Sequence, residues 1–290
     1  MANILVAIPI HGGSPELSRT IEGLRHAVDR IDGGCDLLIT NSGLPLEQSI
    51  EWCHDVDVVA IPNNQFWAGA VATIYKIARE KHYTAVFLLN HDCCPSETAL
   101  VRLHREFSRD RNVVAHAKLV LANDVDTTWW AGSAVPPLSR LRYHGAFEER
   151  SNRIEPYATD AMMGQLMLIP IQYCRPAFLH RHLLPHYYSD SVQSIEMKNH
   201  GARLVVVPCA VGFTDQSDEH RKQKRIRPVS FRRLVMSLSR PYSQRRLISV
   251  VMGNYYHHCR SVQGIIVGIA SGFGTLFKAF YEFIKYSVFR

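Results

Sequence analysis

Short apolar runs in the first half of the chain alternate with segments in which apolar residues recur every three to four positions. The runs are predicted strands, at residues 4–10, 36–40, 56–61 and 85–90. The intervening segments are predicted helices, at residues 15–28, 46–54 and 68–82. Continuous apolar strands that alternate with amphipathic helices are typical of a largely parallel sheet covered on both faces. The pattern therefore predicts an α/β fold.

The alternation breaks after a further strand-like run at residues 113–121. Residues 123–159 are rich in Trp, Tyr, Pro and Gly without a clear period, so we predict a loop-rich region suited to binding an acceptor. A helix is predicted from near Asp190, followed by a strand at 203–208. We place a boundary near residue 220, between a domain at 1–220 and a basic, amphipathic helical region at 221–290.

The C-terminal region has a large apolar helix face and a second face of small residues, Gly264, Gly268 and Gly272. The apolar residues recur every three to four positions, at Ile265, Ile269, Phe273, Leu276 or Phe277, Phe280 and Ile284. The least polar part, 264–277, is shorter than the roughly 20 residues that cross a bilayer, so a spanning helix is not expected. An in-plane membrane helix, a homo-oligomer contact and a helix folded back on the domain all fit this pattern, and the first is favoured.

The formal charge of +7 is unevenly distributed along the chain. Residues 221–260 include many Lys and Arg and no Asp or Glu, which favours an anionic partner. No nucleic-acid-binding motif accompanies this charge, so nucleic acid is not expected. Anionic lipid head groups or a pyrophosphate-linked acceptor fit better.

Composition and cysteine usage are those of a globular, cytoplasmic protein. With 290 residues and 47% hydrophobic content, the chain can bury the core of one large domain plus an appendage. It runs from Met-Ala-Asn directly into the first predicted strand, without the features of a secretory signal. The seven cysteines are expected to be reduced and mostly buried, because their number is odd and no Cys-x-x-Cys or Cys/His ligand spacing occurs. Zinc is not expected at Cys93 and Cys94, because adjacent cysteines rarely reach one zinc ion together. We expect a cytoplasmic enzyme that is peripheral at the inner membrane face.

Two predicted strands end in polar residues that are suited to a nucleotide. The first ends in His11-Gly12-Gly13, with Ser14 as a candidate N-cap of the next helix, and phosphates bind at such sheet edges. The strand 85–90 leads into Asn90-His91-Asp92, where a carboxylate can hold a divalent cation against a diphosphate. The alternatives are an ordinary strand-to-helix turn at His11 and a helix cap at Asp92.

Several segments in this order resemble family 2 glycosyltransferases, in particular the bacterial rhamnosyltransferase-like group, over roughly residues 3–220. They are Ile8-Pro9-Ile10-His11, Thr40-Asn41-Ser42, the segment from Asn63 to Gly69 that includes Trp67, Leu89-Asn90-His91-Asp92, the segment from Thr159 to Pro170, and the segment from Pro185 to Asp190. The resemblance implies a GT-A fold, which is a Rossmann-like, mostly parallel mixed sheet flanked by helices.

The same resemblance implies roles for individual residues. Asp92 corresponds to the ligand of Mg²⁺ or Mn²⁺, and Asp190 corresponds to the catalytic base of an inverting transfer. The implied nucleotide-sugar contacts are Ile8, Pro9, His11, Thr40, Asn41, Asn63, Trp67, Asn90 and His91. The implied cleft for the donor sugar and acceptor contains Asp160 and Gly164, and we add Trp130, Gly132 and His186 on their chemistry. For Trp130 a core position is the alternative to stacking on a sugar, and for His91 and His186 a structural role is the alternative.

The chain departs from the family pattern at four positions. Thr40 replaces an Asp, Val192 replaces an acidic residue, Glu196 replaces an Arg, and Thr214 replaces a His found in many members. We expect a metal-dependent transferase that moves sugar from a UDP- or dTDP-type donor to a glycan or lipid-linked oligosaccharide in cell-surface polysaccharide synthesis. The departures leave open a catalytically inactive glycan-binding or membrane scaffold, and a nucleotidyltransferase is the other rival.

Overall fold

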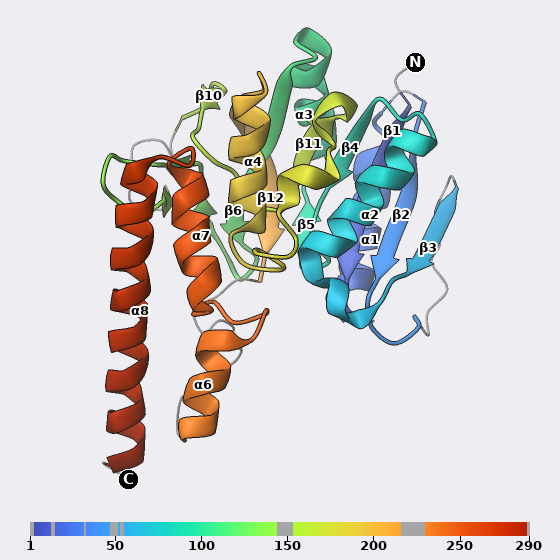
Figure 1. Ribbon diagram of the computed structural model, residues 1–290. Coiled ribbons are helices and arrows are strands. Elements are labelled where there is room, and N and C mark those ends of the chain that lie inside the picture. The colour runs from blue at the N-terminus through green and yellow to red at the C-terminus, as the bar shows by residue number, and fades with distance from the viewer. Residues whose placement is uncertain are drawn as a thin grey trace.

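The computed structural model describes residues 3–12, 15–31, 33–46, 52, 55–143, 153–215 and 230–288. Its centre is a ten-stranded mixed sheet in the order β10-β12-β6-β11-β4-β1-β2-β3, with β5 paired to β12 and β7 paired to β6 (Figure 1). The strands are β1 Ile4–Ile10, β2 Cys35–Asn41, β3 Val56–Ala60, β4 Ala85–Leu88, β5 Cys93–Pro95, β6 Val113–Leu121, β7 Asp124–Trp130, β10 Tyr157–Ala158, β11 Met167–Pro170 and β12 Arg203–Thr214. The predicted α/β fold is confirmed.

Strand direction determines where polar side chains gather. Strands β1, β2, β3 and β4 are parallel, and β6 and β12 run in the same direction because β11 is antiparallel to both β4 and β6. The carboxyl ends of all six strands therefore meet at one edge of the sheet. In open α/β sheets this is the edge at which ligands bind.

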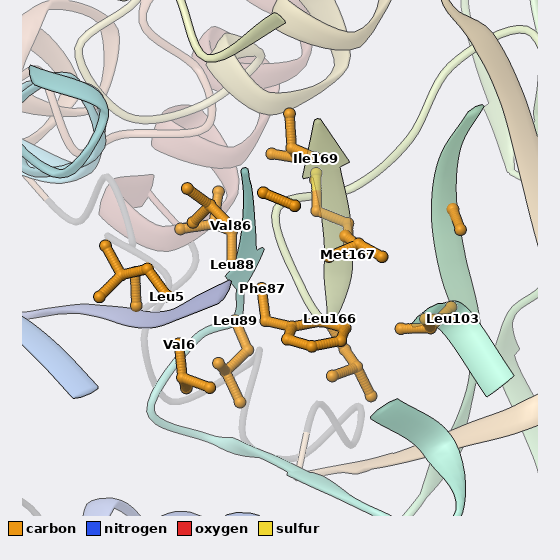
Figure 2. Packing of buried hydrophobic residues seen from close by; sticks show 14 of the residues in the cluster. Leu5, Val6, Val86, Phe87, Leu88, Leu89, Leu103, Leu166, Met167 and Ile169 are labelled. Atoms are coloured by element: carbon orange, nitrogen blue, oxygen red, sulfur yellow. The ribbon is translucent and has the colours of Figure 1, made fainter. Parts of the chain in front are cut away.

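Helices cover both faces of the sheet. Helix α1 Pro15–Val28 packs on β5 near α3 Ala99–Arg109, while α2 Phe66–Glu80 and α4 Ser189–Asn199 share the other face. The amide of Gln193 on α4 donates to the hydroxyl of Tyr75 on α2, which joins these two helices. The apolar strands β1, β4 and β11 are fully buried between the two layers, and Leu103 of α3 packs against them (Figure 2).

The expected strand at 203–208 continues to Thr214. Pro208 lacks an amide donor, and the pairing of β12 with β6 shifts register between Val207 and Val211 before it resumes. Pro208 lies in this bulge, and the strand continues beyond it to pair with β5.

The loop-rich expectation for 123–159 is wrong in part. Strand β7 forms an antiparallel pair with β6, β8 Ser133–Ala134 pairs with β9 Arg142–Tyr143, and β10 lies at the edge of the main sheet. The alternation of β7 is hidden in the sequence because its first residues are exposed and its last residues are two tryptophans. Residues 47–51 and 53–54 of the expected helix 46–54 lie outside the described residues, as do Gly13 and Ser14 of the first loop.

Three helices form the C-terminal region, which we call the arm: α6 Phe231–Ser239, α7 Leu247–His257 and α8 Val262–Val288. Figure 1 shows α7 and α6 beside the long α8, whose C-terminal end points away from the sheet. The expected boundary near residue 220 falls outside the described residues. The argument that the apolar helix is too short is wrong, because Val262–Tyr286 is long and apolar enough to cross a membrane by length and composition.

Candidate functional site

The carboxyl ends of β1 and β2 are joined by a polar network around Asn41. The Asn41 side-chain oxygen accepts hydrogen bonds from the backbone N–H of Gly12 at 2.9 Å and of Gly43 at 2.8 Å. The ring of His11, which is exposed, lies 3.0 Å from the Ser42 hydroxyl. A Cβ on Gly43 would lie 2.3 Å from the Gly12 nitrogen, so only glycine fits this crossing. Asn41 thus fixes Gly12 and Gly43 at the sheet edge expected for a nucleotide.

Three residues predicted to contact the nucleotide do not present side chains at this surface. Ile8 and Pro9 lie in the buried strand β1, and Thr40 has no exposed surface. The Thr40 hydroxyl has no hydrogen-bond partner among the described residues. The neutral Thr40 is therefore tolerated where an unpaired carboxylate would be costly. Any contact of these three residues with a nucleotide would have to come from the backbone.

The segment Asn90-His91-Asp92 forms the turn between β4 and β5. The Thr20 hydroxyl of α1 donates to the His91 carbonyl at 2.7 Å, and Asp92 is 7% exposed at the start of β5. Its neighbour Cys93 pairs with Thr214 at the end of β12. Helix α3 begins at Ala99 with Thr98 before it, so the alternative in which Asp92 caps this helix is wrong.

Trp67, in the first turn of α2, links this turn to the other side of the site. Its indole N–H donates to the Asn90 side-chain oxygen at 3.0 Å. The indole ring also packs on Gly164, where an added Cβ would lie 2.4 Å from a ring carbon. Asn63 lies one turn earlier, exposed in the 3-10 helix Asn63–Gln65. The predicted Asn63–Trp67, Asn90–Asp92 and Gly164 motifs are therefore neighbours in space.

Asp190 completes this chain of contacts at the start of α4. One carboxylate oxygen accepts from the Gly164 N–H at 2.9 Å and the other from the Ser191 N–H at 2.8 Å. Burial raises the pKa of Asp190 above its usual value, and these two N–H donors oppose the rise. A carboxylate with a raised pKa and free lone pairs is a stronger proton acceptor than an exposed one.

His186 lies in the segment that precedes α4. It is half-buried and its ring meets Tyr187 edge-on at 4.7 Å. The adjacent Pro185 carbonyl accepts from the Ala68 N–H at 3.0 Å, so this segment lies against the first turn of α2 beside Trp67. Tyr188, the residue before α4, has a φ of 69°, which is a strained value for a side chain of this size. The strain sits two residues before the predicted base.

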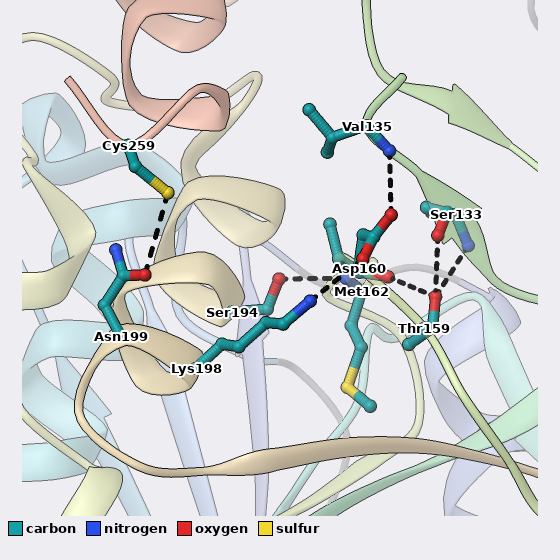
Figure 3. A network of polar contacts seen from close by, with 10 residues as sticks. Ser133, Val135, Thr159, Asp160, Met162, Ser194, Lys198, Asn199 and Cys259 are labelled. Atoms are coloured by element: carbon teal, nitrogen blue, oxygen red, sulfur yellow. Dashed lines mark hydrogen bonds and ion pairs between the residues drawn. The ribbon is translucent and has the colours of Figure 1, made fainter. Parts of the chain in front are cut away.

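Asp160 lies away from Asp190, at the other end of α4. It accepts hydrogen bonds from the Lys198 ammonium at 2.9 Å and from the Val135 N–H at 3.1 Å (Figure 3). The separation of eight positions between 190 and 198 corresponds to about 12 Å of helix. Asp160 instead lines a cavity of about 840 Å³ between β10, the start of β12 and the ends of α3 and α4.

Trp130 occupies the core, as the alternative interpretation expected. Its side chain has no exposed surface, its N–H donates to the Ser133 hydroxyl at 3.1 Å, and its ring lies 4.1 Å from that of His116. It therefore offers no face to a sugar. Gly132, with a φ of 105°, packs against the Thr159 and Val206 side chains and serves the turn after β7.

Residues of the arm contact Ser191 and Tyr188, on either side of Asp190, and the sequence did not predict these contacts. The buried ring of His257 lies 2.9 Å from the hydroxyl of Ser191, and Gly253 of α7 packs against the Tyr188 ring. Arg260 forms an ion pair with Glu196 of α4, which also meets the His180 ring at 3.1 Å. The Glu196 departure was the available signal, because a new acid on α4 implies a cationic partner elsewhere in the chain.

The residues around Asp92 fit a divalent cation that a diphosphate also binds. Asp92 supplies a hard carboxylate oxygen in the turn between β4 and β5, and Thr214, whose buried hydroxyl has no hydrogen-bond partner among the described residues, lies beside Cys93. No three His, Cys, Asp or Glu side chains converge in the described part of the chain. The site thus fits Mg²⁺ or Mn²⁺ completed by phosphate and water rather than a cage made only of protein.

The fold and the arrangement of these residues define a GT-A-like α/β protein with its site at the carboxyl edge of the sheet. The profile described as "Glycosyl transferase family 2" matches residues 5–175. The chain therefore belongs to glycosyl transferase family 2.

Solved structures agree with this fold. The crystal structure of GalNAc-T7 with UDP, GalNAc and Mn²⁺ matches with a TM-score of 0.55 at 17% identity, over 74% of this chain. The matched region is 44% of that protein, so the chain spans less than half of its length. A search of curated protein sequences finds no match.

Proposed function

We propose that the protein is an inverting glycosyltransferase that moves a sugar from a nucleoside diphosphate donor to a hydroxyl of a glycan or lipid-linked oligosaccharide. The observation that carries the proposal is the chain of contacts from Asn90 through Trp67 and Gly164 to Asp190. It joins the segment that carries the candidate cation ligand, Asp92, to a carboxylate of raised pKa. Inversion needs a base on the acceptor side of the reacting sugar, while the nucleoside diphosphate leaves from the opposite side.

Asp190 acts as the general base in this mechanism. It accepts the proton of the acceptor hydroxyl while that oxygen forms a bond to the anomeric carbon. The bond between the anomeric carbon and the phosphate oxygen breaks, and its electron pair leaves with the nucleoside diphosphate. The Gly164 and Ser191 N–H groups fix the orientation of the carboxylate during this step.

Asp92 would hold a divalent cation, together with oxygens of the diphosphate. When bound, such a cation neutralises the charge that develops on the leaving group. Asn41 and the loop at Gly12 shape the neighbouring sheet edge for the nucleotide, and His11 and His91 are available as hydrogen-bonding groups. The Mn²⁺ and UDP in GalNAc-T7 support a metal-dependent donor site of this kind.

The donor and acceptor classes follow from the family resemblance. We propose a UDP- or dTDP-type donor, a place in the rhamnosyltransferase-like group, and an acceptor used in cell-surface polysaccharide synthesis. We also propose a cytoplasmic enzyme that is peripheral at the inner membrane face, with self-association as a further property. The basic arm supports the membrane location, since anionic head groups attract Lys and Arg.

The direct test is release of nucleoside diphosphate from a panel of nucleotide-sugars by the purified protein, with Mn²⁺, Mg²⁺ or chelator. We expect one donor to be hydrolysed slowly with metal. The Asp190→Asn variant should reduce transfer to a suitable acceptor by about 10²–10⁴-fold while it still binds the nucleotide. Asp92→Asn should remove the metal dependence of nucleotide binding.

Asp126→Asn, an exposed carboxylate on β7, is the matched control and should leave activity unchanged. Absence of both turnover and metal-dependent nucleotide binding in the wild type would contradict the proposal and favour a binding or scaffold protein. A retained anomeric configuration in the product would overturn the inverting mechanism alone.

A further inference from the structure

The helix α8 packs on the rest of the protein through its small residues. A Cβ on Gly264 would lie 2.8 Å from the Tyr255 carbonyl oxygen, and one on Gly268 would lie 2.7 Å from the Val251 carbonyl oxygen. Gly272 is buried on the same side. The three glycines allow α7 and α8 to approach closely, backbone against backbone.

The large apolar side chains of α8 point away from the protein. Their exposed fractions reach 73% at Val262 and 72% at Phe277. The exposed residues, which we call the outer stripe, are Val262, Ile265, Ile266, Ile269, Phe273, Leu276, Phe277, Phe280, Tyr281 and Ile284. Their spacing of three to four residues places them on one continuous face of a helix about 40 Å long.

This arrangement is the reverse of the one expected for a helix on a water-soluble domain. There, large apolar residues face the core and polar residues face the solvent. Helices that pack through small residues and turn large apolar residues outward are typical of a lipid environment. An exposed patch of this size marks a surface that binds a partner.

Charge identifies the kind of partner. Residues 221–290 contain 14 Lys and Arg and a single acid, Glu282, which is ion-paired with Arg245 at 2.7 Å. Lys278 and Lys285 are exposed three and four residues from Tyr281, at one margin of the outer stripe. Lysines at the edge of an apolar face can place their ammonium groups among anionic head groups.

We propose that the outer stripe is inserted into one leaflet of an anionic bilayer, with α8 lying in the membrane plane. The inner face of α8 contacts the catalytic domain, because the Arg140 guanidinium donates to the Ser271 hydroxyl at 2.7 Å and to the Ser271 carbonyl at 3.0 Å. The ring of His258 also lies 2.8 Å from the Ser139 carbonyl. A spanning α8 would carry Arg140 and the Arg245–Glu282 pair into hydrocarbon, which is costly.

This inference rests on the proposed function, since the in-plane orientation would fix how the site faces the acceptor. Helix α7 contacts α8 on one side and α4 on the other, where it supports Ser191 and Tyr188 next to Asp190. The membrane would therefore lie at a fixed distance from the base. This arrangement suits an acceptor whose lipid part stays in the leaflet while its sugar enters the site.

The test is flotation of the purified full-length protein with vesicles of phosphatidylcholine, with and without phosphatidylglycerol. The wild type should bind the anionic vesicles preferentially. The triple variant Ile266→Gln/Phe273→Gln/Phe277→Gln should bind at least about tenfold more weakly, because three large apolar side chains no longer enter the hydrocarbon boundary. Lys278→Gln/Lys285→Gln should lose most of the preference for anionic lipid while retaining its circular dichroism spectrum.

Val125→Gln/Ile154→Gln is the matched control, since both side chains are exposed apolar residues of the catalytic domain. This control should bind as the wild type does. Depth is tested with the single variants Ile266→Trp and Phe280→Trp and with bromine-labelled lipids. An in-plane helix predicts equal, shallow quenching at both positions, and a gradient in depth would overturn it.

Vesicle binding requires no donor, so its failure is distinguishable from failure of the proposed transferase activity. Unchanged binding of the triple variant would overturn the proposal. A wild-type dimer in lipid-free buffer that the triple variant abolishes would also overturn it, because a second copy would then cover the outer stripe.

Discussion

The catalytic domain and the arm have similar proportions of apolar residues but opposite arrangements of them. In the domain, Ile, Leu, Val and Phe fill the sheet core, and residues 1–220 contain 19 Lys and Arg against 25 Asp and Glu. In the arm, glycines form the close contacts and large apolar residues are exposed, with 14 Lys and Arg against one acid. The difference shows that hydrophobic content alone does not define a protein core. Large apolar residues that face inward indicate water around the protein, whereas small residues that face inward with large apolar residues outside indicate lipid.

The largest expected effect is on the domain side of this comparison. In Gly164→Ala the new Cβ would collide with Trp67, which must shift and weaken its hydrogen bond to Asn90. We expect activity to fall by about a hundredfold, because the Gly164 N–H also positions Asp190. Steady-state kinetics with the donor found in the panel measures this, and Gly274→Ala, an exposed position of α8, is the control. Wild-type activity in Gly164→Ala would show that the contact chain has no catalytic role.

The second effect tests the inner face of the arm. Gly268→Leu places a side chain against the Val251 backbone, which must move, so α7 and α8 separate. We expect a loss of about 2–3 kcal/mol in the free energy of unfolding, which is typical of overpacking. Urea unfolding followed by circular dichroism measures it. Ile269→Gln on the outer stripe should change stability by less than about 0.5 kcal/mol in lipid-free buffer. Equal losses in both variants would remove the distinction between the two faces.

The third effect compares two buried histidines, one in each region. Burial lowers the pKa of His116 in the domain to about 4 and that of His257 in the arm to about 3. The unfolded state takes up protons near pH 6.5, while the folded state does not. The free energy of unfolding therefore falls as the pH drops below 6.5, and it continues to fall until the pH reaches the pKa of the histidine in the folded state. Each histidine should cost about 2 kcal/mol between pH 7.5 and pH 5.

The His257→Gln variant should therefore lose about half of this acid sensitivity. Urea unfolding at pH 5 and pH 7.5 measures the change, with His82→Gln, an exposed histidine, as the control. An unchanged pH dependence in His257→Gln would mean that His257 is protonated or exposed in the folded arm.

The smallest effect tests the junction between the two regions. Glu196 is buried and forms an ion pair with Arg260, whose side chain is half exposed, so the pair is partly screened by water. A double-mutant cycle with Glu196→Gln and Arg260→Gln should give a coupling of about 1 kcal/mol in the free energy of unfolding. The exposed pair Lys76–Glu80 should give a coupling near zero. No coupling at Glu196 would mean that other contacts join arm and domain, such as those of His257 with Ser191 and of Arg140 with Ser271.

The sequence predicted the elements whose burial is nearly complete. Strands β1 and β6 and helix α1 have the predicted bounds, because each lies wholly in the core or has one apolar face. The bulge at Pro208 and the exposed start of β7 were not predicted, since pairing with neighbouring strands decided both. The α/β fold and glycosyl transferase family 2 could thus be predicted, whereas the sheet order could not.

For the site, the sequence by itself determined which residues are candidates for the chemistry. Asp92, Asp190, Asn90 and Gly164 were recognisable because carboxylates, amides and glycines stand at the ends of apolar strands or in family motifs. Only the tertiary structure decided that Trp67 joins Asn90 to Gly164, and that Asp160 and Trp130 lie elsewhere. It also decided that the glycines of α8 face inward. The physical reason is that sequence spacing orders residues along one strand or helix, while contacts between elements depend on how their surfaces pack.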